Sequence, residues 1–228
     1  MSDGTRCEVP PAGGASHFGD DSWAGLCSFA DMLAREGEVR GLVGPRELDR
    51  LWSRHILNST AVLDFLPDSG VVVDVGSGAG FPGMIVAIAR PDLEVVLVDS
   101  MERRCQWLRD VVGTLGVANV RVVNSRAEKL AGKIAADVVT ARAVAALKKL
   151  LPWTMPLLKP GGSLIALKGA RVDEEIDDAV DALRAFDAQW ADVYGVVPFG
   201  TDELTRVLEV RKKQGSTARK KQDQPRRR

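Results

Sequence analysis

Apolar residues recur along the chain in two alternating patterns. Short runs rich in Val, Ile and Leu have the length of buried strands, and longer segments place apolar residues three and four positions apart, as amphipathic helices do. Because strands that alternate with helices require right-handed crossovers, this order predicts an α/β fold whose mostly parallel sheet has helices on both faces. We predict seven strands, at residues 71–75, 95–98, 120–123, 137–140, 163–167, 190–197 and 204–210, the last two forming an antiparallel hairpin.

Helical spacing begins well before the first strand. Ser22 offers an N-cap for a helix that runs to Glu38, and Pro45 suits the first turn of a second helix that runs to Leu66. The first residues of the chain are rich in Gly, Pro, Ser and Asp and look disordered. The pattern therefore divides the chain into a disordered N-terminus (1–20), a helical cap (21–66), a sheet domain (67–210) and a basic flexible tail (211–228).

Further helices are predicted between and after the strands. Apolar periodicity indicates helices over residues 101–115, 147–158 and 173–186. The second of these contains Pro152 and Pro156, so we expect it to be kinked or divided.

The formal net charge of zero conceals an uneven distribution. The tail contains nine Lys or Arg residues and a single acidic residue, Asp223, so the rest of the chain is mildly acidic. A basic, flexible arm is typical of proteins that bind a polyanion such as RNA, although it can also serve only to keep a protein in solution.

Other compositional features exclude several classes of site. The three cysteines and two histidines show none of the close pairings that a structural metal or a disulfide framework needs, so no metal is expected. We find no apolar run of the roughly 18 residues that a membrane span requires, and no export signal at the start. A cytoplasmic location is the default expectation.

A glycine-rich turn follows the first strand. Gly78, Gly80 and Gly83 satisfy the G-x-G-x-x-G fingerprint of dinucleotide-binding folds. The same stretch also reads acid-x-Gly-x-Gly-x-Gly, with Asp74 two residues before Gly76, and this resembles motif I of class I S-adenosylmethionine-dependent methyltransferases. A carboxylate at this turn would attract the cationic S-adenosylmethionine and repel a pyrophosphate, so Asp74 favours the second interpretation.

Residues at the carboxyl ends of later strands should meet at the same edge of the sheet. Asp99 could accept from both hydroxyls of a ribose, or it could cap the helix that follows it. Ala127 and Glu128 could border an adenine, although Glu128 could equally be a surface acid. Phe81, next to the glycine turn, could pack on a cofactor or belong to the core.

Two cations end the fourth and fifth strands. Arg142 and Lys168 could hold the O6 of a guanine or a neighbouring phosphate, or each could form a surface ion pair. Transfer of a methyl group to a purine N7 needs no general base, which suits a chain with no histidine at the strand ends. Methylation of an exocyclic amine usually accompanies an Asn/Asp-Pro-Pro-aromatic motif that residues 140–143 lack, and no cysteine ends a strand to attack a pyrimidine.

Six blocks of the sequence together resemble one family. These are residues 54–59, 74–83, 99–100, 125–128, 141–143 and 166–169, and they are similar to the bacterial 16S ribosomal RNA guanine-N7 methyltransferases of the glucose-inhibited division B type. The likeness extends from about Leu26 to Val210. It implies a Rossmann-like class I methyltransferase fold and transfer of a methyl group from S-adenosylmethionine to a guanine of the 530 loop in 16S rRNA.

The resemblance also implies site residues and partners. The cofactor-binding residues would be Asp74, Gly76, Gly78, Gly80, Phe81, Asp99, Ala127, Glu128 and Arg142, with Arg142 and Lys168 acting in catalysis. His55 would contact RNA, or it would pack beside Trp52. The substrate would be 16S rRNA in the small ribosomal subunit or an assembly intermediate, bound by a monomer. The alternatives are an NAD(P)-dependent oxidoreductase and a non-catalytic RNA-binding module.

Overall fold

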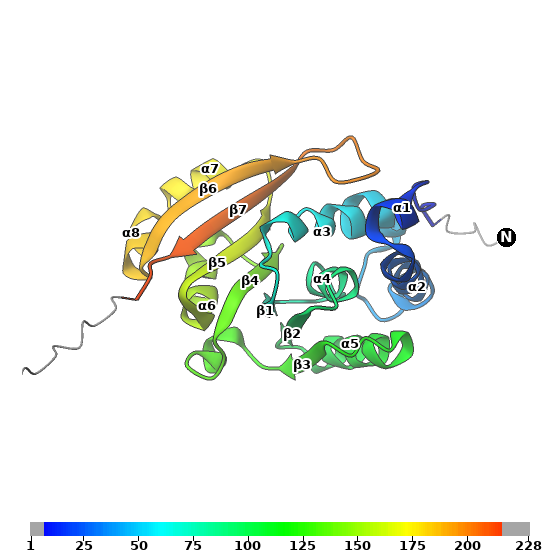
Figure 1. The fold of residues 1–228 in the computed structure, drawn as a ribbon, viewed down its shortest axis with the longest axis horizontal. Coiled ribbons are helices and arrows are strands. Elements are labelled where there is room, and N and C mark those ends of the chain that lie inside the picture. The colour runs from blue at the N-terminus through cyan, green and yellow to red at the C-terminus, as the bar shows by residue number, and fades with distance from the viewer. Residues whose placement is uncertain (1–6, 216–228) are drawn as a thin grey trace, which may run out of the picture.

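A single seven-stranded sheet organises the chain (Figure 1). The computed structural model describes residues 7–215, and its strand order is β3-β2-β1-β4-β5-β7-β6. β1 to β5 run parallel, and β7 lies antiparallel between β5 and β6. The predicted Rossmann-like architecture and its C-terminal hairpin are therefore confirmed. The strands are β1 (Gly70–Val75), β2 (Leu93–Asp99), β3 (Val120–Asn124), β4 (Ala136–Arg142), β5 (Leu158–Lys168), β6 (Ala188–Val196) and β7 (Thr205–Lys212).

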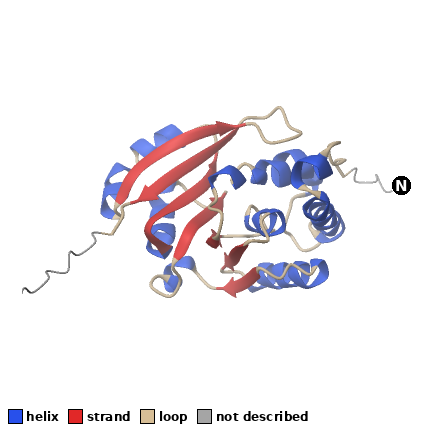
Figure 2. Ribbon diagram, viewed as in Figure 1, coloured by secondary structure: helices blue, strands red, loops and turns tan. Residues whose placement is uncertain are grey.

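Helices cover both faces of the sheet (Figure 2). Alternation along β1 sends Val72 into a core shared with α2, α4 and α5, and sends Val73 into a second core shared with α6, α7 and α8. The α-helices are α1 (Gly14–Phe18), α2 (Asp20–Glu36), α3 (Asn58–Thr60), α4 (Gly83–Ala89), α5 (Glu102–Leu115), α6 (Leu147–Thr154), α7 (Val172–Asp177) and α8 (Val180–Ala185).

The strand order reverses between β1 and β4. The chain leaves β1 toward β2 on one side and leaves β4 toward β5 on the other. Connections that diverge in this way open a crevice beyond the carboxyl ends of the two strands, where open α/β sheets bind their ligands.

The helical cap is more irregular than its periodicity predicts. The single helix expected from Pro45 to Leu66 is wrong: the segment consists of η1 (Pro45–Arg50, 3₁₀), η2 (Leu51–Leu57, a π-helix), α3 and η3 (Leu63–Phe65, 3₁₀). The four buried residues of η2 form two pairs five residues apart, which is the separation of a π-helical hydrogen bond. A π-helical turn brings the two members of each pair to the same side of the helix, so that both can be buried. The pairs are Leu51 with Ile56 and Trp52 with Leu57.

Two terminal expectations also change. Residues 14–18, which we expected to be disordered, form α1 because long-range aromatic contacts order them: His17 stacks on Phe199 with ring centroids 4.3 Å apart. At the other end, β7 includes Arg211 and Lys212, which the charge pattern places in the flexible tail. Residues 1–6 and 216–228 lie outside the described residues, and the four-part division of the chain stays a prediction.

Smaller differences arise at helix and strand ends. The predicted helix over residues 147–158 is divided, as expected, into α6 and the 3₁₀ helix η5 (Met155–Leu157). The helix predicted over residues 173–186 is two short helices, α7 and α8. β5 begins at Leu158, before the predicted strand 163–167, and Lys159 Nζ reaches Asp137 Oδ2 of the neighbouring strand at 2.7 Å.

Candidate active site

A cavity of about 360 Å³ lies at the carboxyl ends of β1, β2, β3 and β4. This volume is within the range of small-molecule sites, which extends from about 300 to about 1,000 Å³. Residues from several separate segments line it, and four of these residues were predicted to bind a cofactor. The predicted residues are Gly76, Asp99, Ala127 and Glu128, and the others include Arg104, Val144 and Trp153.

The glycine turn brings backbone, not side chains, to the cavity wall. Gly76 has φ +73°, a conformation that a Cβ would strain, and its N–H donates to Val98 O of β2 at 2.8 Å. Gly78 and Gly80 do not line the cavity. Gly80 instead allows close packing under the turn, because a Cβ there would lie 3.0 Å from both Met84 and Phe29.

Asp74 lies beneath the turn and has no exposed surface. Thr140 Oγ1 donates to Asp74 Oδ1 at 2.8 Å, whereas Oδ2 faces the backbone of Gly83 without a well-formed hydrogen bond to any described residue. Burial raises the pKa of Asp74 to about 6, against the opposing effect of hydrogen bonds from Ser77 and Thr140. The expectation that this carboxylate faces a cofactor is not met, because strand alternation points residue 74 toward α4.

Asp99 lies at the cavity wall and also holds backbone N–H groups, while its predicted contact with a ribose stays a prediction. Its side chain lines the cavity, and it also accepts two backbone hydrogen bonds: Met101 N–H donates to Oδ1 at 2.8 Å and Gly78 N–H donates to Oδ2 at 3.0 Å. Arg104 Nη1 lies 3.5 Å from Oδ2. A carboxylate offers about four lone-pair sites, so Asp99 can tie the glycine turn to α5 and still accept from a ligand hydroxyl.

The segment after β3 supplies another wall of the cavity. Ala127 is buried and Glu128 is exposed, at the start of the 3₁₀ helix η4 (Ala127–Leu130). Both line the cavity, as predicted. Arg104 and Trp153 were missed, because residues of these types in amphipathic helices show no spacing that separates a ligand contact from packing. Arg104 Nε is buried and has no hydrogen-bond acceptor among the described residues.

A second cavity, also of about 360 Å³, adjoins the first. The two cavities share Ala143 and Val144, and Ala143 has φ +53°, an uncommon conformation for a residue with a Cβ. Arg142, Lys168 and Arg171 line the second cavity. Arg142 and Lys168, the two predicted cations, therefore lie together in the second cavity and do not line the first.

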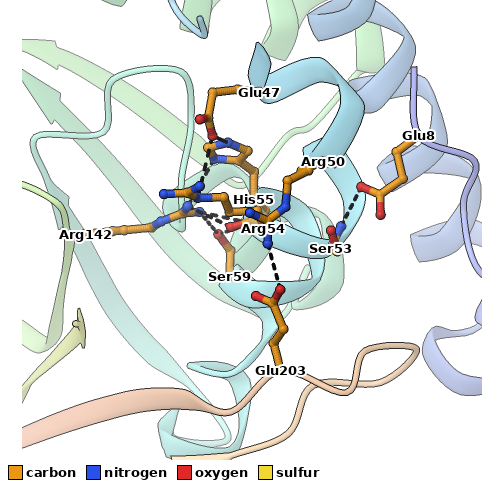
Figure 3. Close-up of polar contacts among 9 residues, drawn as sticks. All are labelled: Glu8, Glu47, Arg50, Ser53, Arg54, His55, Ser59, Arg142 and Glu203. Atoms are coloured by element: carbon orange, nitrogen blue, oxygen red, sulfur yellow. Dashed lines mark hydrogen bonds and ion pairs between the residues drawn. The ribbon is translucent and has the colours of Figure 1, made fainter. Parts of the chain in front are cut away.

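The guanidinium of Arg142 is anchored to the helical cap (Figure 3). Nη2 donates to Arg54 O at 2.8 Å, and Nη1 donates to His55 O at 3.1 Å and to Ser59 Oγ at 3.2 Å. Its carbon Cζ lies 5.4 Å from the centre of the Phe81 ring. Burial and, to a smaller extent, the charge of Arg54 together lower the pKa of Arg142 to about 10, against the opposing effect of Glu47.

His55 links Arg142 to a carboxylate. Its Nδ1 lies 3.0 Å from Arg142 Nη2, and its Nε2 lies 2.6 Å from Glu47 Oε2. Burial and the charge of Arg142 lower the pKa of His55, although Glu47 opposes this effect. The ring also stacks on Phe81 at 5.3 Å between centroids. Phe81 is therefore packed between aromatic rings and Arg142 and does not line the first cavity, which favours its core role.

Lys168 is paired as well. Only 8% of its side chain is exposed, and Nζ donates to Glu175 Oε2 at 2.7 Å and to Ala145 O at 2.9 Å. Glu175 Oε2 also accepts from Leu147 N–H at 2.8 Å. The ion-pair alternative therefore holds for Lys168, and the pair fixes the segment 143–147 that separates the cavities.

The described residues contain neither a membrane-spanning helix nor a metal-binding cluster. Among residues 7–215, no helix is both long and apolar enough to span a bilayer. In the same part of the chain, no group of three His, Cys, Asp or Glu side chains is arranged to hold a metal ion.

Two solved structures illustrate the shared fold. TYW2 from M. jannaschii, solved in complex with AdoMet, aligns over 70% of this chain and 76% of its own, with a TM-score of 0.56 and 16% identity. Precorrin-6y C5,15-methyltransferase from Geobacter metallireducens aligns over 68% of this chain and 87% of its own, with a TM-score of 0.51 and 16% identity. At this level of identity the likeness establishes the fold.

Sequence comparison is more specific. A protein of Beutenbergia cavernae named ribosomal RNA small subunit methyltransferase G is 51% identical over 191 residues, which are 84% of this chain and 90% of that protein. A protein of the same name from Leifsonia xyli is 50% identical over 203 residues, 88% of this chain and 95% of that protein. The GidB family model, described as rRNA small subunit methyltransferase G, matches residues 23–195. With this match and these relatives, the chain belongs to the GidB family of rRNA small subunit methyltransferases.

Proposed function

We propose that this protein transfers a methyl group from S-adenosylmethionine to N7 of a guanine in the 530 loop of 16S rRNA. The observation that carries the proposal is the pair of adjoining cavities at the switch point of the sheet, which share the wall formed by Ala143 and Val144. A methyl donor in one cavity and an acceptor base in the other would meet across this short wall, as a transfer between two bound molecules requires.

The residues of the first cavity fit the proposed cofactor. Asp99 retains lone pairs for ribose hydroxyls, and the unpaired N–H of Arg104 Nε is a donor that an oxygen of the ligand would satisfy. Gly76 brings its backbone to the cavity wall, and Ala127 and Glu128 would border the adenine. When bound, S-adenosylmethionine supplies an electrophilic methyl group carried on a sulfonium.

The second cavity would hold the acceptor guanine. The N7 lone pair carries no proton, so the chain needs no general base and contributes alignment and electrostatics. Arg142 and Lys168 would hold the walls of this cavity, because both are already paired within the protein. Arg171 lines the same cavity, is exposed and makes no ion pair with the described residues, so it is the cation that would meet guanine O6 or a phosphate.

The substrate class suggests the wider setting. We propose that the protein acts as a monomer on a small-subunit particle in the bacterial cytoplasm, with the basic tail adding phosphate contacts. The relatives carry the name of a methyltransferase, which favours neither an oxidoreductase nor a non-catalytic RNA-binding module.

Mass mapping of the methylated nucleotide tests the proposal. Small subunits from a strain that lacks this methylation are incubated with the protein and S-adenosylmethionine, and the product RNA is digested and sequenced by mass. We expect one added methyl group on one guanine of the 530 loop.

Asp99→Ala should lower kcat/KM by at least about tenfold, because it removes the ribose acceptor and loosens the glycine turn. Asp92→Ala, an exposed acid at the opposite edge of the sheet, is the matched control. A methyl group elsewhere, or none, would refute the proposal.

A further inference from the structure

A chain of contacts runs from Glu47 through His55 to Arg142 (Figure 3) and continues from Arg142 to the ring of Phe81, so it connects the helical cap to the cavity walls. Glu47 comes from η1, His55 from η2, Arg142 from the end of β4, and Phe81 from the glycine turn. Three regions far apart in the sequence, the helical cap, the glycine turn and the end of β4, therefore meet at one imidazole ring. The alignment of donor and acceptor cavities depends on these segments keeping their relative positions.

The hydrogen-bond partners determine where the His55 ring carries its proton. A guanidinium has donors only, so the contact of 3.0 Å between Arg142 Nη2 and His55 Nδ1 requires Nδ1 to be an unprotonated acceptor. The hydrogen of the neutral ring then lies on Nε2, which donates to Glu47 Oε2 at 2.6 Å. Both ring nitrogens are thus occupied within the protein.

This occupancy argues against a direct RNA contact for His55. Only 14% of the side chain is exposed, and one ring face stacks on Phe81. The expected RNA contact at His55 would need a free ring nitrogen. What the ring offers instead is a single acceptor directed at Arg142.

We propose that His55 is a positioning residue: its neutral, Nε2-protonated ring holds the Arg142 guanidinium against Phe81, and methyl transfer requires this form. The inference rests on the proposed function. A second proton on the ring would have to occupy Nδ1, where it would face Arg142 Nη2. The hydrogen bond would then be lost, and the imidazolium and the guanidinium would repel each other. The charged groups that surround the ring are Glu47, Arg54 and Arg142, and the two arginines disfavour that second proton while Glu47 favours it.

A shift of Arg142 away from a protonated His55 would affect both cavities. Arg142 precedes Ala143, the strained residue that the two cavities share, and its guanidinium covers the ring of Phe81 in the glycine turn. An acid-induced loss of the His55 contact therefore loosens the wall between donor and acceptor. We expect kcat/KM to fall about tenfold for each pH unit below the pKa of His55, as for any group that must be unprotonated.

The decisive variant is His55→Asn. An asparagine Oδ1 occupies roughly the place of Nδ1, accepts from Arg142 and does not titrate. We expect this variant to keep kcat/KM within about tenfold of the wild type at pH ~8, since it loses the contact with Glu47 and the stack on Phe81 but keeps the acceptor for Arg142. Its acid limb should show one unit less slope. His55→Phe keeps the ring stack but offers no acceptor, so its kcat/KM should fall by at least about tenfold at every pH. An acid limb in His55→Asn as steep as that of the wild type would overturn the proposal.

The other histidine of the chain supplies the matched control. His17 stacks on Phe199 beside α1, so His17→Asn should leave the pH profile as it is in the wild type. The same variant also identifies which signals in the ¹H–¹⁵N spectrum of the full-length protein belong to His55, because the chain has only two histidines. That spectrum should show His55 as the Nε2–H tautomer at neutral pH, and a ring protonated at Nδ1 under these conditions would overturn the proposal without reference to activity.

Glu47→Gln tests the other side of the ring. The amide oxygen still accepts from Nε2, but the charge that favours protonation of His55 is gone. The pKa of His55 measured from the ¹H–¹⁵N spectrum should therefore be lower than in the wild type. The acid limb of kcat/KM should shift to lower pH by the same amount. A pKa that rises or stays constant would contradict the arrangement. If the wild type methylates no small-subunit RNA at any pH, the proposed function fails, and the spectrum still decides the tautomer.

Discussion

The buried carboxyl group of Asp74 should make the stability of the protein depend on pH in an unusual direction. Its pKa is raised from the ordinary 3.8 to about 6, chiefly by burial. Because the folded pKa lies above the unfolded one, the folded state holds this proton more tightly. The resulting stabilisation is complete below about pH 4 and is lost as the pH rises through about 6. Most paired carboxylates in proteins behave in the opposite way.

The magnitude follows from the shift. A pKa that moves from 3.8 to about 6 corresponds to about 3 kcal/mol of differential stability, at about 1.4 kcal/mol per pH unit. Asp74→Asn removes the titration and keeps an oxygen that can accept from Thr140. The buried amide of the variant adds a constant free-energy term, but a constant term cancels when two pH values are compared.

Urea unfolding of the ligand-free protein at a series of pH values measures the effect. Between about pH 3 and about pH 7.5, the wild type should lose about 3 kcal/mol of unfolding free energy relative to Asp74→Asn. The control is Asp92→Asn at an exposed carboxylate whose pKa is lowered by Arg90, so its dependence should be small and of opposite sign. A difference between wild type and Asp74→Asn that is constant with pH, or that runs the other way, would refute the account of this site.

Three other predictions concern the glycine turn, the wall between the cavities and the tail. Gly80→Ala should destabilise the protein by about 1–3 kcal/mol in urea unfolding, because φ is +117° and the new Cβ would press on Met84; an unchanged midpoint would show that the turn can relax. Lys168→Met leaves Glu175 half-buried without its cation, so methyl transfer should fall by about tenfold or more, and full activity would mean that the segment 143–147 needs no such anchor. Removal of residues 216–228 should weaken binding to small-subunit RNA most at low salt and flatten the salt dependence, and an identical slope would leave the tail without phosphate contacts.

Local pattern alone determined most of the scaffold. Runs such as residues 95–98 can be buried on both faces only inside a parallel sheet, and the glycines after Asp74 can be accommodated only in a sharp turn. These properties depend on neighbours within a few residues, so one sequence suffices to predict the strands, the turn and the strand ends that meet around the crevice. Asp99, Ala127 and Glu128 were located in this way, since Asp99 follows directly on one predicted strand and the other two come a few residues after the next strand.

The tertiary structure decided what the side chains do. Arg142 was expected to grip a ligand, but its partners are the carbonyls of Arg54 and His55, 88 and 87 residues away, and no local pattern encodes that pairing. The π-helical turn of η2 and the order of α1 likewise depend on contacts with distant segments. A side chain satisfies its charge and hydrogen bonds with whatever the fold brings near it, so the position of a residue along the chain indicated where it would lie, and only its partners in space established its role.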